Sequence, residues 1–278
     1  MSDDKQRNDR HEEGISIMLS QSFVEIPVKG SLIEGAVAVS LQGDLCIPKD
    51  PKGLVLFSHG SGSGRQSPRN KYVAKALNED GLATLLVDLL TQEEEQADIR
   101  AQKVQCKIPG LVLNKFNIKL LANRLSSITS WLWQNPRCKD LIIGYFGAST
   151  GTAAALIAAA AGPTDNQRKT HEEETPQRTS TIGAIVSRSG RPDLAGVEYL
   201  NKIKIPTLFI VGGNDHNQVL SWNKNALSGL GSEKKKIVVV PNASHLFDEP
   251  GTLEEVARLA SGWFRCYFGI TQHAMENK

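Results

Sequence analysis

The chain contains, at residues 141–151, the segment Leu141-Ile142-Ile143-Gly144-Tyr145-Phe146-Gly147-Ala148-Ser149-Thr150-Gly151. Its first six residues form a short apolar run, which is typical of a strand buried on both faces of a sheet. The pentapeptide G-x-S-x-G follows at once, and an alanine-rich stretch with helical character occupies residues 152–161. A strand, this pentapeptide and a helix in direct succession predict a nucleophile elbow, a tight turn that exposes the Ser149 hydroxyl above the sheet.

Short apolar runs alternate with helical stretches from residue 54 onward. The runs lie at residues 54–57, 83–87, 141–146, 182–186, 207–211 and 237–240. This alternation predicts one doubly wound α/β domain with a parallel sheet covered by helices. Upstream, residues 23–28 and 37–47 alternate apolar and polar side chains, which predicts an antiparallel strand pair. We therefore predict a mostly parallel, eight-stranded sheet with helices on both faces.

The predicted domain extends over residues 21–270. Residues 1–20 have the polar composition of a disordered tail, and residues 271–278 are expected to form a C-terminal tail. Within the domain, residues 163–180 are polar and charged and predict a solvated insertion loop. A second interruption, at residues 91–114, predicts a long connection after the fourth strand that is acidic at its start.

The composition excludes several classes of function. A net charge of +2, without a basic stripe interleaved with aromatic residues, argues against nucleic-acid binding. The polar N-terminus has no apolar signal region, and no segment reaches the length that spans a bilayer, so we expect no membrane partner. Four scattered cysteines without a C-x-x-C motif predict free thiols and a cytoplasmic location. No histidine pair or acidic cluster has metal-ligand spacing, so no metal is expected.

A serine nucleophile requires a base, and the base requires a carboxylate to orient it. His245 lies in the loop after the last predicted strand, and Asp215 lies just beyond the strand before it. The order Ser149, Asp215, His245 is the order that a nucleophile elbow of this kind uses. Two other carboxylates remain alternatives for the acid, because Asp88 also ends a strand and Asp248 lies close to His245 in the sequence.

The oxyanion that forms when serine attacks a carbonyl needs preorganised N–H donors. One expected donor is the backbone N–H of Thr150, and the second is the backbone N–H of Ser61, with Gly60 as the alternative. His59 opens the same glycine-rich loop, and we expect it to brace this loop beside the substrate. Arg188 follows the strand at residues 182–186, where it has two interpretations, a structural brace or a ligand for a substrate carboxylate.

These motifs together resemble the α/β-hydrolase superfamily, and within it the dienelactone-hydrolase-like group of small bacterial hydrolases. The matching stretches are Leu56-Phe57-Ser58-His59-Gly60-Ser61-Gly62-Ser63-Gly64-Arg65, Ser67-Pro68-Arg69-Asn70, Gly144-Tyr145-Phe146-Gly147-Ala148-Ser149-Thr150-Gly151, Ser187-Arg188-Ser189-Gly190-Arg191-Pro192-Asp193-Leu194-Ala195 and His245-Leu246-Phe247. The resemblance implies the α/β-hydrolase fold, with Ser149, Asp215 and His245 as the catalytic triad.

The expected activity is hydrolysis of a small carboxylic ester, lactone or thioester through an acyl-enzyme, without a cofactor. Dienelactone hydrolase itself uses a cysteine nucleophile, and the serine found here favours an ordinary ester or thioester. The same residues also suit acyl transfer or perhydrolysis. A small-ligand receptor that keeps an intact triad is the alternative from outside the enzymes, because a fold does not imply a function. The expected partner is a small molecule, and the sequence leaves open whether the protein is a monomer or a dimer.

Overall fold

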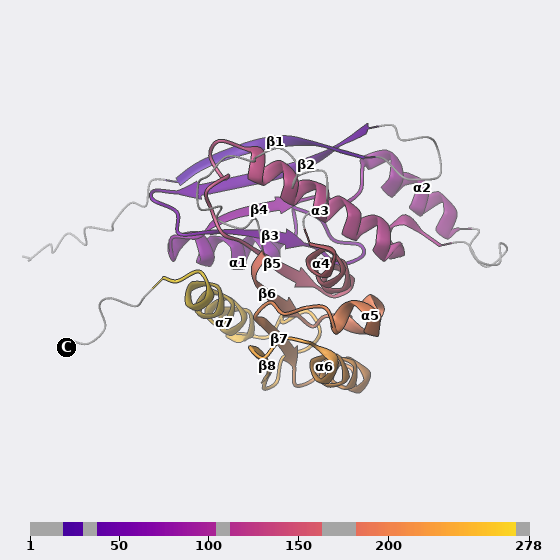
Figure 1. Ribbon diagram of the computed structural model, residues 1–278. Coiled ribbons are helices and arrows are strands. Elements are labelled where there is room, and N and C mark those ends of the chain that lie inside the picture. Colours follow the sequence, from indigo (N-terminus) through magenta and orange to yellow (C-terminus); the bar gives the residue numbers. More distant parts are fainter. Residues whose placement is uncertain (1–18, 30–37, 104–111, 163–181, 271–278) are drawn as a thin grey trace, which may run out of the picture.

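The computed structural model describes residues 19–29, 38–103, 112–162 and 182–270 (Figure 1). Of the tail predicted over residues 1–20, Leu19 and Ser20 fall within these ranges and already belong to a strand, so the first strand begins earlier than predicted. The predicted insertion loop at residues 163–180 and the predicted tail at residues 271–278 lie outside the described residues.

Eight strands of the described chain form one sheet, in the order β1-β2-β4-β3-β5-β6-β7-β8. β1 and β2 are antiparallel, β2 is antiparallel to β4, and each neighbouring pair from β4 to β8 is parallel. The strands are β1 (Leu19–Lys29), β2 (Ala38–Pro48), β3 (Leu54–Ser58), β4 (Ala83–Val87), β5 (Ile143–Ala148), β6 (Ile182–Arg188), β7 (Thr207–Gly212) and β8 (Lys235–Val240). The predicted sheet and its antiparallel beginning are confirmed.

Helices cover both faces of this sheet (Figure 1). One face carries α1 (Pro68–Glu79) and α7 (Thr252–Tyr267); the other carries α3 (Ile118–Gln134), α4 (Thr150–Ala161) and α6 (Asn217–Gly229). The shorter elements are η2 (Asn114–Phe116), η4 (Pro192–Ala195) and α5 (Val197–Leu200).

The central strands supply side chains to two separate apolar cores. In β3, Leu54 and Leu56 belong to the cluster that includes α3 and α4, whereas Val55 and Phe57 belong to the cluster that includes α1 and α7. Successive side chains of a strand point to opposite faces, so a strand covered on both faces must be apolar throughout. This is the physical reason why its sequence shows a continuous apolar run.

The long connection predicted at residues 91–114 begins with a helix that was not predicted, α2 (Gln92–Gln102). A capping box starts the helix: the Thr91 hydroxyl accepts the N–H of Glu94 at 3.3 Å, and the Glu94 carboxylate accepts the N–H of Thr91 at 2.9 Å. Glu94 also accepts a hydrogen bond at 2.6 Å from the buried Arg124 of α3. The helix has almost no buried face, so apolar periodicity could not reveal it; the T-x-x-E spacing was the available signal.

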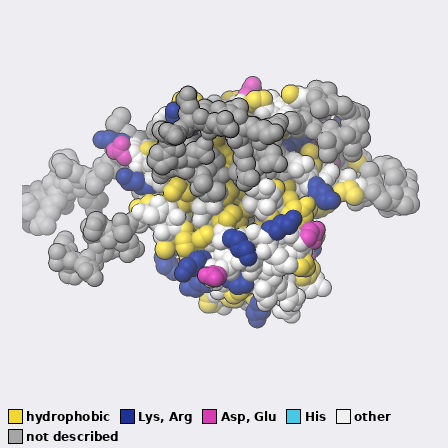
Figure 2. Space-filling view, in the orientation of Figure 1, with side chains coloured by type: hydrophobic (Ala, Val, Ile, Leu, Met, Phe, Trp, Pro, Cys, Tyr) yellow, Lys and Arg dark blue, Asp and Glu magenta, His cyan; other side chains and the backbone are white. Residues whose placement is uncertain are grey.

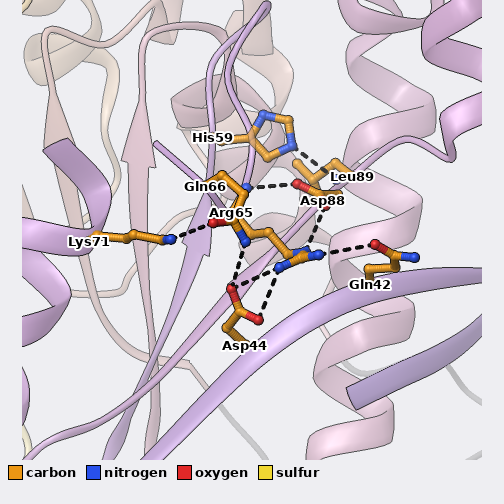
Figure 3. A network of polar contacts seen from close by, with 8 residues as sticks. All are labelled: Gln42, Asp44, His59, Arg65, Gln66, Lys71, Asp88 and Leu89. Atoms are coloured by element: carbon orange, nitrogen blue, oxygen red, sulfur yellow. Dashed lines mark hydrogen bonds and ion pairs between the residues drawn. The ribbon is translucent and has the colours of Figure 1, made fainter. Parts of the chain in front are cut away.

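Arg65 fastens the loop between β3 and α1 to neighbouring strands (Figure 3). Its backbone N–H donates to Asp88 Oδ1 at 2.7 Å, and its guanidinium lies 3.0 Å from Asp88 Oδ2 and 3.0 Å from Asp44 Oδ2. Asp44 belongs to β2 and Asp88 follows β4, so one arginine joins three segments of the chain. Both oxygens of Asp88 are therefore occupied by Arg65.

His59, the first residue after β3, makes a second connection from this loop to the segment after β4 (Figure 3). Its Nε2 accepts the N–H of Leu89 at 2.9 Å, so the ring is neutral and Nδ1 carries the proton, which is donated to the Gly60 carbonyl at 3.0 Å. Burial lowers the pKa of the His59 imidazole, against smaller opposing effects of the Gly60 carbonyl and the Asp88 charge. Both ring nitrogens are engaged within the protein.

Helix α7 approaches β5 closely because β5 carries a glycine at the contact. A Cβ placed on Gly144 would lie 2.6 Å from a ring carbon of Phe264 and 2.9 Å from one of Phe268. By contrast, a Cβ on Gly262, on the exposed side of α7, would meet nothing within 4 Å. We expect Gly144→Ala to lower the free energy of unfolding by about 1–3 kcal/mol, because it overpacks a filled core.

The matched control is Gly262→Ala, which should raise the free energy of unfolding by about 0.5–1 kcal/mol through the better helix propensity of alanine. Urea denaturation of both variants measures the two values. Equal stability of Gly144→Ala and the wild type would show that α7 does not need this close approach.

The neutral, buried state of His59 also predicts a pH dependence. The pKa of His59 is lower in the folded protein than in the unfolded chain. Below about pH 6.5, His59 of the unfolded chain therefore binds a proton, whereas His59 of the folded protein stays neutral. The free energy of unfolding should therefore fall as the pH drops below that value, by up to about 1.4 kcal/mol per pH unit from this group. In His59→Gln this acid-side slope should be shallower, and in a control, His216→Gln at an exposed histidine, it should persist. Identical slopes in His59→Gln and the wild type would contradict the assignment.

Candidate active site

Ser149 occupies a strained turn between β5 and α4. Its backbone has φ 48° and ψ −122°, a region that a residue with a side chain adopts only when its surroundings enforce it. A Cβ on Gly147 would lie 2.6 Å from the Cα of Thr152, and a Cβ on Gly151 would lie 2.1 Å from the Ser58 carbonyl oxygen. Both flanking glycines are thus required by close backbone contacts. The chain therefore makes the predicted tight turn between strand and helix, with Ser149 at its apex.

The backbone of Ser149 is also tied to the loop after β6. Its N–H donates to the Arg188 carbonyl at 3.2 Å, and its own carbonyl accepts the N–H of Arg191 at 3.0 Å. These two hydrogen bonds join the turn to the neighbouring parallel strand. They hold the serine in place without using its side chain.

His245 and Asp215 are joined by a direct hydrogen bond. Nδ1 of His245 lies 2.9 Å from Oδ2 and 3.0 Å from Oδ1 of Asp215. The Asp215 side chain is 1% exposed, whereas the His245 side chain is 40% exposed. Because an ionised carboxylate can only accept, Nδ1 must carry a proton, and in the neutral imidazole this leaves Nε2 with a free lone pair. That arrangement prepares His245 to accept a proton at Nε2.

Asp215 receives two further hydrogen bonds. The Ser189 hydroxyl donates to Oδ2 at 2.6 Å, and the backbone N–H of His216 donates to Oδ1 at 2.7 Å. Burial acts to raise the pKa of the Asp215 carboxyl, but the hydrogen bonds from His245 and Ser189 outweigh burial, so that pKa lies below its ordinary value. Asp215 is therefore held ionised. Sequence reasoning did not identify Ser189, whose own φ is 41° and which has no motif that would reveal it.

The other two candidate acids are engaged elsewhere. Asp88 binds Arg65, as described above, and Asp248 lies 3.2 Å from Nη1 of Arg69 at the start of α1. The structure thus brings His245 together with Asp215. Between Ser149 Oγ and His245 Nε2, both described, the structure has no hydrogen bond within the usual limits. Such contacts are often long before substrate binds and tighten in the complex.

The loop after β3 lies directly against the turn that carries Ser149. A Cβ on Gly60 would be 3.0 Å from the Cβ of Ser149, so the loop backbone touches the serine. The N–H of Ser61 points across this contact and donates to the Thr150 hydroxyl at 2.8 Å. Thr150 is the first residue of α4, where a backbone N–H has no partner within the helix. The two expected oxyanion donors are thus brought together, and one of them already has an acceptor.

Arg188 is a buried cation without a carboxylate partner among the described residues. It is 7% exposed; Nη1 has no hydrogen-bond partner, and Nη2 makes one long contact of 3.4 Å with Oδ1 of Asn70. Burial, and after it the charge of Arg69, lower the pKa of its guanidinium to about 10, while Asp248 opposes them. Charged side chains are rarely buried unless they are paired. This arginine therefore has capacity to bind an anion.

A cavity of about 800 Å³ lies beside the loop after β3. Gly60 and Ser61 form part of its wall, and Thr91, Glu95 and Ile99 at helix α2 form another part. Ser149 and His245 are not among its lining residues, so the cavity adjoins the site from the side of the loop. Residues from the segment 91–114 therefore contribute to the walls near the expected oxyanion position.

Three further features bear on other functions: metal-ligand clusters, membrane-spanning helices and charge on the surface. Within the described ranges, no group of three or more His, Cys, Asp and Glu side chains is placed to hold a metal ion. None of the described helices combines the length and the apolar character needed to cross a membrane. Lys and Arg side chains are scattered among hydrophobic and uncharged ones on the face drawn in Figure 2.

No family model matches the chain. Two curated relatives from Mycobacterium tuberculosis, strains CDC 1551 / Oshkosh and ATCC 25618 / H37Rv, are each 48% identical over 233 residues, which is 84% of this chain and 45% of the relative. Their names propose them as phosphoribosyl transferases. The chain thus spans less than half of the length of proteins with that name.

Solved structures match the chain more completely. Dienelactone hydrolase from Anabaena variabilis ATCC 29413 is 48% identical, with a TM-score of 0.70 and coverage of 88% of this chain and 98% of that one. Est1E from Butyrivibrio proteoclasticus (15% identical, TM-score 0.63, covering 88% and 99%) and esterase Pf2001 from Pyrococcus furiosus (16%, 0.62, covering 90% and 94%) share the fold. Since the match to the first of these is nearly complete in both directions at 48% identity, the chain belongs to the α/β-hydrolase superfamily, in its dienelactone-hydrolase-like group.

Proposed function

We propose that the protein is a serine hydrolase that cleaves a small carboxylic ester, lactone or thioester. The observation that carries this proposal is the pair of His245 and Asp215, joined at 2.9 Å, together with the strained turn at Ser149. The solved esterases and dienelactone hydrolase of the same fold support ester hydrolysis as the reaction class. The free thiols of Cys46, Cys138 and Cys266 support the proposal of a cytoplasmic location.

In the proposed reaction, Ser149 Oγ attacks the carbonyl carbon while its proton passes to Nε2 of His245. The carbonyl electron pair moves to oxygen, where the Thr150 N–H is the expected donor; the Ser61 N–H, the second donor predicted from the sequence, already donates to the Thr150 hydroxyl. Asp215 stabilises the imidazolium and stays ionised. His245 then protonates the leaving group, the carbon–oxygen or carbon–sulfur bond breaks, and water hydrolyses the acyl group from Ser149. No cofactor is needed for any of these steps.

The match to the curated relatives does not bring phosphoribosyl transfer into this proposal. The 48% identity covers 45% of each relative, so the activity in their name belongs to a protein of more than twice this aligned length. The features of the site described above, a serine at an elbow and a histidine–carboxylate pair, suit attack on an acyl carbon. An acyl acceptor other than water would turn the same steps into acyl transfer or perhydrolysis.

The nucleophile is tested by intact-mass labelling with a fluorophosphonate, beside turnover of short-chain nitrophenyl esters. We expect one adduct on the wild type, none on Ser149→Ala, and a loss of turnover of at least about 10³-fold in the variant. Ser228→Ala, at an exposed serine of α6, is the control and should label like the wild type. Labelling of Ser149→Ala would place the nucleophile elsewhere. Absence of both adduct and turnover in the wild type, with tight binding of a small molecule, would favour the receptor.

Arg188 is proposed to bind a negatively charged group of the substrate. Arg188→Met removes the cation and keeps much of the volume, so it should lower kcat/KM for an ester that carries a carboxylate by at least about tenfold relative to a matched neutral ester. Because the buried charge has no carboxylate partner among the described residues, the variant should fold at least as stably as the wild type in urea denaturation. An unchanged ratio between the two esters would leave Arg188 a structural role only.

A further inference from the structure

The Thr150 side chain lies where the two halves of the expected oxyanion site meet. The Ser61 N–H, from the loop after β3, donates to Thr150 Oγ1 at 2.8 Å across a sequence separation of 89 residues. Thr150 directly follows Ser149 and is 5% exposed, whereas Ser61 is exposed, so the bond is partly buried. The Ser61 N–H, which was expected to face the oxyanion, therefore donates to the Thr150 hydroxyl instead.

A hydroxyl that accepts a hydrogen bond keeps its own proton to donate. Among the described residues, the Thr150 hydroxyl donates to no acceptor, and the Thr150 backbone N–H likewise has none. Both hydrogens belong to Thr150, on N and Oγ1 atoms that are three bonds apart, and Thr150 directly follows the nucleophile. Two donors without acceptors at such a place need a partner, and a substrate oxygen is a partner of the right kind.

We propose that the Thr150 hydroxyl is a catalytic residue that donates a hydrogen bond to the oxyanion, with the Ser61 N–H polarising it from behind. This inference rests on the proposed serine hydrolysis. The chain of donors runs from the Ser61 N–H to the Thr150 Oγ1 and from its hydrogen to the substrate oxygen. Successive hydrogen bonds of this kind strengthen one another. The Thr150 proton stays on its oxygen throughout, and the proton that moves in the reaction passes from Ser149 to His245.

The alternative use of the same contact is a hydroxyl that fills the oxyanion position and must rotate away. That movement would break the 2.8 Å bond and turn a buried, β-branched side chain out of its rotamer. Donation to the oxyanion requires only a rotation of the O–H about the Cβ–Oγ1 bond. Donors that need no rearrangement during the reaction are the effective ones in catalysis, so the geometry favours donation.

Thr150→Val tests the proposal, since valine keeps the shape and removes the hydroxyl. We expect kcat for a nitrophenyl ester to fall by about a hundredfold, the loss typical for one side-chain donor to an oxyanion, while KM stays close to the wild-type value. Thr150→Ser is the matched control and should retain most of the wild-type kcat. A kcat in Thr150→Val that equals or exceeds that of the wild type would overturn the proposal.

A trifluoromethyl ketone separates catalysis from a structural effect. Ser149 adds to the carbonyl of this inhibitor and forms an anionic hemiketal. The affinity of the inhibitor should therefore weaken in Thr150→Val by the same factor as kcat/KM. A structural brace would instead lower the melting temperature and leave these two factors unrelated, which would contradict the proposal. If Thr150→Val does not fold, Thr150→Ala and Thr150→Ser give the same comparison, because they differ by one hydroxyl.

The fluorophosphonate adduct on the wild type keeps the two proposals distinguishable. An adduct at Ser149 with full activity in Thr150→Val would remove the role of the hydroxyl and leave the serine hydrolase in place. A wild type without adduct and without turnover would remove both.

Discussion

The direct backbone contact between the loop after β3 and the turn after β5 is the constraint on which the site depends. Gly151 leaves no room for a Cβ beneath the Ser58 carbonyl, and Gly60 lies against the side chain of Ser149. This contact places the expected oxyanion donors of the two segments next to each other and next to the serine. The strain at Ser149 is held by this packing and by hydrogen bonds to the loop after β6. Arg65 fixes the same loop to β2 and to Asp88 after β4, and His59 fixes it to Leu89.

Two buried charged side chains of the site, Asp215 and Arg188, differ in how many hydrogen bonds they make. Asp215 receives hydrogen bonds from His245, Ser189 and His216, so both oxygens of its carboxylate have hydrogen-bond donors. Arg188 has a single long contact, to Asn70. An unpaired buried charge costs stability, and a bound anionic ligand would pair with the Arg188 guanidinium and offset this cost. In the proposed reaction the first charge orients His245, and the second is proposed to bind a charged group of the substrate.

Membership of the dienelactone-hydrolase-like group fixes less about the substrate than about the fold. The resemblance was apparent from the segments around Ser61, Ser149 and His245, and the match at 48% identity confirms it. The walls of the cavity of about 800 Å³ come from the connections between strands, among them the one that contains helix α2. A common scaffold with variable loops is the way in which such folds carry different reactions.

The eight strands and the turn at Ser149 could be predicted because their signals are local. The central strands, buried on both faces, must be apolar throughout, β1 and β2 alternate apolar and polar side chains, and a turn that approaches another backbone closely must have glycine. Helix α2 was missed because it buries almost no side chain and so has no apolar period. The choice among Asp88, Asp215 and Asp248 rested on chain order alone, and all three lie in connections that follow strands.

The contacts of His245 with Asp215, of Ser189 with Asp215 and of Ser61 with Thr150 join residues 30, 26 and 89 positions apart. Strand order and close packing decide such contacts, and no local pattern of residues records them.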